Sequence, residues 1–108
     1  MTGKREHDVY TLMVEVGRSE DDDLPDGATG GGILLYSSGV DEAEAVREAV
    51  ALLKQAGLAP LEVTGYGTLA DRLAEGEDIG QEERDLMARA LAENAVVVAQ
   101  LTPIFSND

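Results

Sequence analysis

Four short runs rich in apolar residues predict β-strands. They cover residues 9–16, 33–37, 61–66 and 95–101. The first run has the clearest period of two, which places four apolar side chains on one side of an extended chain: Tyr10, Leu12, Val14 and Val16. That alternation predicts a strand with one buried face.

A segment with a helical period lies between the second and third runs. Over residues 41–56, Val46, Val50 and Leu53 recur on one side. Asp41 is placed as an N-cap with Glu44 three residues later, which is the spacing of a capping box. Gly57 is placed as a left-handed C-cap. Shorter patterns predict a helix that opens at Thr68 and another over residues 81–93.

The predicted order of elements is β-β-α-β-α-α-β, which indicates an α+β fold. We expect a two-layer sandwich, with a mixed four-stranded sheet and the helices packed on one of its faces. Residues 1–108 form a single domain in this interpretation. Its ends, 1–8 and 104–108, are expected to be flexible, and residues 17–32 to form an acidic, glycine-rich loop.

A sheet covered by helices on one side leaves its other face open. In this arrangement the open face carries Thr11, Met13, Thr64 and Tyr66. That set is too apolar for a solvated surface. The pattern therefore predicts a homodimer through the helix-free sheet face, unless another part of the chain covers it.

Composition narrows the classes of function. The chain has 22 acidic and 8 basic residues, a formal net charge of −14, and no cysteine. Such a charge repels nucleic acid and anionic membranes. It favours solubility or adaptation to a salty cytoplasm, a basic protein partner, or mimicry of the charge of nucleic acid. Thiolate catalysis and disulfides are excluded. The N-terminus lacks the pattern of a signal peptide and no run is long enough to span a membrane, so we expect a cytoplasmic location.

Glycines flank an aromatic residue where the third predicted strand meets a helix. Gly65, Tyr66 and Gly67 offer an approachable backbone and an aromatic face. Ser37 and Ser38 follow the second strand and are predicted to join the same ligand-binding site. The alternative is that the glycines only allow a tight turn.

The acidic loop suggests a cation site at Asp21, Asp23 and Asp26, because hard cations prefer clustered carboxylates. The spacing departs from the EF-hand template, since Leu24 and Ile33 fall on ligand positions. A solvated loop is the competing interpretation. No residue pattern indicates a cofactor, and none singles out a catalytic group.

The leading hypothesis is a non-enzymatic protein-interaction or regulatory module. The alternative is a small-ligand-binding module that uses the Gly65–Gly67 turn. A third hypothesis is an enzyme that uses paired carboxylates, which 22 acids permit but no spacing identifies.

Overall fold

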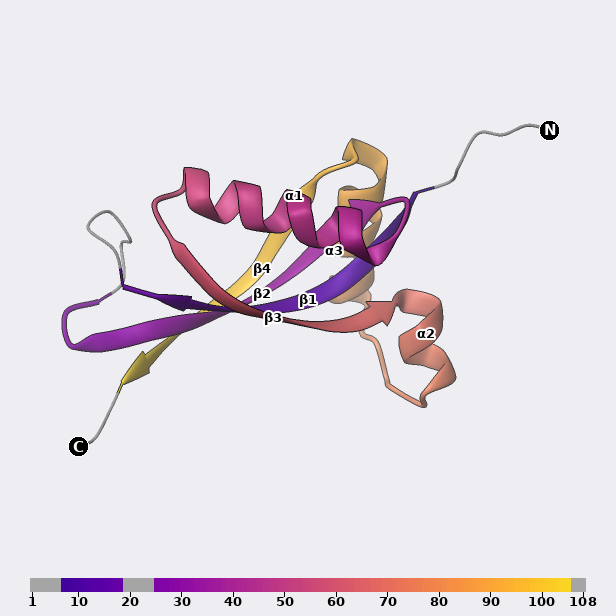
Figure 1. The fold of residues 1–108 in the computed structure, drawn as a ribbon. Helices are drawn as coiled ribbons and strands as arrows, with labels where there is room; N and C mark the ends of the chain where they lie inside the picture. The colour runs from indigo at the N-terminus through magenta and orange to yellow at the C-terminus, as the bar shows by residue number, and fades with distance from the viewer. Residues whose placement is uncertain (1–6, 19–24, 106–108) are drawn as a thin grey trace.

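The computed structural model describes residues 7–18 and 25–105. Its elements are β1 (Asp8–Gly17), β2 (Ala28–Gly39), α1 (Glu42–Gln55), β3 (Ala59–Thr68), α2 (Leu69–Ala74), α3 (Gln81–Glu93) and β4 (Val96–Phe105), shown in Figure 1. The α+β class, the four-stranded sheet and the order of the elements are confirmed.

The strands lie in the order β3-β1-β2-β4, and every neighbouring pair is antiparallel. Helix α1 carries the chain from β2 to β3, which runs parallel to β2. However, β1 lies between these two strands, so no parallel strands are neighbours. The sheet is therefore antiparallel and differs in this respect from the mixed sheet that the sequence predicted.

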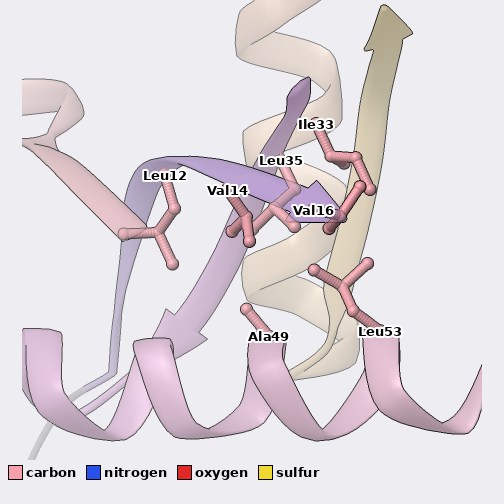
Figure 2. Packing of buried hydrophobic residues seen from close by; sticks show 7 residues of the cluster. All are labelled: Leu12, Val14, Val16, Ile33, Leu35, Ala49 and Leu53. Carbon is pink, nitrogen blue, oxygen red and sulfur yellow. The ribbon is translucent and has the colours of Figure 1, made fainter. Parts of the chain in front are cut away.

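One face of the sheet packs on α1 through an aliphatic core. Figure 2 shows the side chains of β1 and β2 directed toward the helix. The cluster consists of Leu12, Val14, Val16, Ile33, Leu35, Ala49 and Leu53. All of these side chains are almost completely buried, and removing one of the large ones costs about 2–5 kcal/mol in comparable cores.

The opposite face packs on α3. Its cluster takes alternate residues of β1 and β2, Val9 and Tyr36, together with Val97 of β4 and with Ile79, Met87 and Ala90 from the α3 side. The prediction of helices on one face is thus corrected, because both faces of β1 and β2 carry buried residues. No face of the sheet is free of helices. Thr11, expected on an open face, is buried, while Met13 is half-buried and Thr64 and Tyr66 stay exposed.

The predicted N-cap of α1 and the left-handed glycine after its end are confirmed, but the Glu44 carboxylate accepts from the Val40 N–H at 3.0 Å instead of completing the predicted capping box. The Asp41 carboxylate accepts a hydrogen bond from the Glu44 N–H at 2.8 Å, and α1 begins at the next residue, Glu42. Gly57 follows the helix with φ of 82°, and the Leu58 N–H bonds back to the Leu53 carbonyl at 3.0 Å. These bonds satisfy backbone groups that a helix end leaves without partners.

The glycine-rich stretch belongs largely to a strand, which corrects the predicted loop over residues 17–32. β2 already begins at Ala28 and includes Gly30–Gly32. A Cβ at position 30 would lie 2.5 Å from the Val16 carbonyl oxygen, so glycine lets the two backbones approach. The same pairing extends β4 to Phe105, opposite Ala28, within the segment predicted as a loose tail.

At the other end of the chain, Asp8 begins β1 opposite Gly39 and is not part of a tail. No helix in the described ranges is long and apolar enough to cross a membrane.

Candidate functional site

Tyr66 is set apart from its strand by a β-bulge. Gly65 pairs with Leu12 and Gly67 pairs with Thr11, which leaves Tyr66 as an extra residue of β3. Bulges redirect a side chain relative to the sheet. Nearly half of the Tyr66 side chain is exposed, at 47%. It borders a hollow of about 450 Å³ lined by Gly65, Tyr66, Gly67, Asp71, Ala74 and Glu75.

The glycines of this hollow have a structural role. Gly67 has φ of 88°, and a Cβ there would lie 2.8 Å from an Asp71 carboxylate oxygen. That carboxylate accepts a hydrogen bond from the Thr68 N–H at 3.0 Å, while the Thr68 hydroxyl accepts one from the Asp71 N–H. The turn thus requires glycine to form the capping box of α2. Asp71 and Glu75 make the hollow acidic, which favours a cation over an anion.

Ser37 and Ser38 do not join this hollow. The Ser37 hydroxyl donates to the Ala45 carbonyl at 2.7 Å on the α1 face, and the Ser38 hydroxyl lies 3.0 Å from the Asn94 amide oxygen. Both side chains are buried, and β1 separates their strand from β3. The two parts of the predicted ligand site therefore lie apart.

The predicted cation site falls mainly outside the described residues. Asp21 and Asp23 lie there, and Asp26 is exposed. Among residues 7–18 and 25–105, no three acidic or histidine side chains are grouped so that they could hold a metal ion.

Arg72 connects α2 to the rest of its face through a network that sequence reasoning missed. Its guanidinium donates to the Thr11 hydroxyl at 3.0 Å, to Glu77 at 3.0 Å and to Glu83 at 3.3 Å. Burial alone would lower the pKa of Arg72, but the hydrogen bond with Glu77 and the charge of Glu83 raise it on balance. The Arg72 side chain is only 11% exposed, so its guanidinium bonds within the protein and offers little surface to a ligand.

Tyr36 extends the same network beneath α3. Its hydroxyl donates to Glu83 at 2.6 Å. Burial, together with this hydrogen bond and the negative charge, raises the pKa of Tyr36 to about 12 from an ordinary value of 10.0. Two shallow hollows flank Arg72, of about 500 and 240 Å³, and share Leu34 as part of their lining. No sequence spacing links these residues, because they come from four separate elements.

The outer edge of β4 is the second feature that the sequence did not single out. None of the ten residues of β4 is charged, and neither is any residue of its neighbour β2. Four large hydrophobic side chains of β4 are more than 40% exposed: Val98, Leu101, Ile104 and Phe105. Among the described residues, no strand pairs with this edge. The signal in the sequence was the absence of charge from residue 94 to residue 105.

An apolar strip flanks this edge on the α1 face. Val98 and Leu101 pair with Leu35 and Ile33, two residues of the α1-face core, so their side chains share that face. Leu52 of α1 is 38% exposed. Together with Ala51, Glu48 and Val96 it lines a hollow of about 260 Å³ between α1 and the start of β4. The apolar strip therefore consists of Val98 and Leu101, and the Glu48 carboxylate borders the same hollow as Val96.

Two features limit how far another strand could pair with β4. Ala99 is an extra residue, since Leu34 pairs with Gln100 and Leu35 with Val98. Pro103 has no N–H and occurs in sheets at edges. Pro103 therefore limits pairing to residues 96–102, and the bulge at Ala99 interrupts the regular pattern within that range.

Taken together, these features define an antiparallel α+β protein with a helix on each face and one uncharged open edge. The chain belongs to the family described as Domain of unknown function (DUF8846), whose model matches residues 9–105. None of the curated proteins and none of the solved structures matches the chain.

Proposed function

We propose that the chain is a non-enzymatic protein-interaction module of the cytoplasm that makes its contact through the outer edge of β4. One observation carries the proposal: in a chain with a formal net charge of −14, a ten-residue edge strand has no charge and exposes large apolar side chains. Edge strands in soluble proteins are usually protected by charge, by a bulge or by a covering element. An edge strand without charge or a covering element is a site for adding a strand, even where a bulge limits the pairing.

The charge distribution supports a contact at this edge in preference to the rest of the surface. The acidic residues of the described strands lie on β1 and β3, at Asp8, Glu15 and Glu62, and the others on helices and loops. A partner that pairs with β4 therefore meets backbone groups and uncharged side chains on the strand itself, while carboxylates of α1 (Glu48) and α3 (Glu82 and Glu83) line the hollows on either side of it.

Site-specific photocrosslinking in the native host tests the proposal. A photoreactive amino acid replaces Val98 in one variant and Leu61 of β3 in a matched control, since both positions are exposed residues of edge strands. We expect a discrete crosslinked protein from position 98 and none from position 61. Equal crosslinking from the two positions, or none from position 98, contradicts the proposal.

A second candidate function rests on the hollow beside Tyr66. Its volume of about 450 Å³, its exposed aromatic ring and its two carboxylates, Asp71 and Glu75, favour a small cationic ligand. Titration with arginine methyl ester, followed by NMR, tests it. In the wild type we expect shifts of the Tyr66 and Gly67 resonances. The shift of Gly67 should disappear in Tyr66→Ala and remain in Tyr10→Phe. Shifts spread over all acidic residues would contradict a defined site.

A further inference from the structure

We propose that the partner at β4 is a second copy of this chain. The two β4 strands pair in antiparallel fashion around a twofold axis and join their sheets into one continuous sheet of eight strands. This inference rests on the proposed function, because it names the partner of the same edge. It replaces the face-to-face dimer expected from the sequence, since helices occupy both faces of the sheet.

Charge identifies a second copy as the partner. Two chains that each carry −14 repel one another over most orientations. Where β4 meets β4, the paired strands and the strand behind them, β2, carry no charged side chain in either copy. The carboxylates of Glu48 on α1 and of Glu82 and Glu83 on α3 lie to the sides of the paired strands. A basic partner gains no ion pair from β4 itself, since that strand has no carboxylate.

Twofold symmetry favours the antiparallel arrangement of the two β4 strands. A twofold axis perpendicular to the sheet keeps the same face of both copies on the same side. The α1 helices then lie on one face of the joined sheet, and the exposed Val98 and Leu101 of each copy lie on that same face near the axis. A parallel pairing would turn one copy over and separate the two strips.

The backbone sets the extent of the pairing. An edge strand exposes N–H and C=O groups on alternate residues, and a second strand provides partners for both. Pro103 offers no donor, so pairing is expected within residues 96–102. The bulge at Ala99 increases the local twist of the strand, which the joined sheet follows.

The first test measures the mass of the purified full-length chain by light scattering over a range of concentrations. We expect a rise from 11.4 kDa to twice that mass. Val98→Glu combined with Leu101→Glu should weaken the association by at least about 100-fold, because like charges then face each other across the axis. Leu61→Glu, the same change on the opposite edge, should leave it unaltered. A mass of 11.4 kDa at every concentration overturns the inference.

The second test maps the contact by disulfide formation. The chain has no cysteine, so single cysteines are introduced in turn over residues 96–102, with Leu61→Cys as the control. In an antiparallel twofold pair, self-crosslinking is greatest at the residue nearest the axis and declines on both sides. A flat profile, or equal crosslinking at position 61, overturns the proposed pairing.

The two proposals fail in different ways. A chain that is monomeric when purified, but crosslinks from position 98 to another protein in its host, refutes the second copy and keeps the interaction module. No crosslink from position 98 in the host refutes both. A purified dimer whose formation is unaffected by glutamate at 98 and 101 refutes the β4 contact.

Discussion

The sheet ends in two edge strands that are built differently. β3 carries a charge at Glu62, a proline at Pro60, and two bulge residues, Leu61 and Tyr66, that interrupt its pairing with β1. It leads directly into α2, which is fixed by the Thr68–Asp71 capping box and by Arg72. These are features by which proteins prevent the edge of a sheet from pairing.

β4 has fewer of these features. It has one bulge residue, one proline near its end and no charge. Its inner side is held by β2 and its α3 face by Met87 and Ala90, whereas its outer edge meets no other strand of the described chain. The comparison separates two roles: changes around β3 should affect folding and leave association intact, and changes at the edge of β4 should do the opposite.

The largest expected effect on folding comes from Arg72. Replacing it by methionine keeps an apolar chain of similar length but removes its hydrogen bonds to Thr11, Glu77 and Glu83, of which Glu83 still accepts from Tyr36. We expect the free energy of unfolding in urea to fall by about 3 kcal/mol, with no change in dimer affinity.

Arg89→Met is the matched control for this variant. It removes the same charge from an exposed i,i+4 pair with Glu93, and pairs of that kind contribute about 0.3–0.5 kcal/mol. If the two variants lose the same stability, Arg72 does not hold the β3 side of the molecule.

Tyr36 should make folding sensitive to alkaline pH. Its pKa is about 12 in the folded chain and 10.0 in the ordinary state, so its contribution to stability is present below pH 10 and is lost as pH rises toward 12. The loss amounts to about 2–3 kcal/mol. Urea unfolding between those pH values should show that the advantage of the wild type over Tyr36→Phe shrinks by this amount. A constant difference contradicts the buried hydrogen bond with Glu83.

Two glycine substitutions separate backbone strain from steric crowding at the end of β3. Gly67→Ala forces a side chain into a left-handed conformation and against the Asp71 carboxylate, and should cost about 2 kcal/mol of unfolding free energy. Gly76→Ala has nearly the same φ, 87°, but meets no atom within 4 Å, so about 1 kcal/mol is expected from strain alone. Equal losses in urea unfolding would contradict the crowding at Asp71.

The smallest expected effect is that of salt on self-association through β4. Raising ionic strength from roughly 20 mM to roughly 300 mM screens the repulsion between two acidic chains and should strengthen self-association by about threefold to tenfold. Sedimentation equilibrium measures this. Association that weakens with salt would indicate a contact through ion pairs, which β4 cannot supply.

Local features of the fold were predictable from the sequence, because their causes lie within a few residues. Asp41 and Glu44 fix the start of α1, Gly57 fixes its end, and Thr68 with Asp71 opens α2. The strand at Gly30–Gly32 was missed, because its cause is distant: glycine is needed there only once Val16 lies alongside.

The arrangement of the helices on the two faces could not be predicted, because it depends on the order of the strands in the sheet. No local sequence pattern contains that order. β1 lies between β2 and β3, and α1 and α3 pack on opposite faces of the sheet. Tyr66 borders a hollow, whereas Ser37 and Ser38 lie on β2, which β1 separates from the strand of Tyr66. The edge position of β4 also depends on this order, although its lack of charge was already visible.

Hydrogen exchange of the backbone amides at several protein concentrations tests the role of β4 most directly. Pairing of two β4 strands should slow the exchange of the outward-facing amides within residues 96–102 as concentration rises, while the amides of β3 at 59–68 exchange at a constant rate. Exchange in β4 that is independent of concentration, or protection that appears in β3 instead, would contradict the assignment of the contact to this edge.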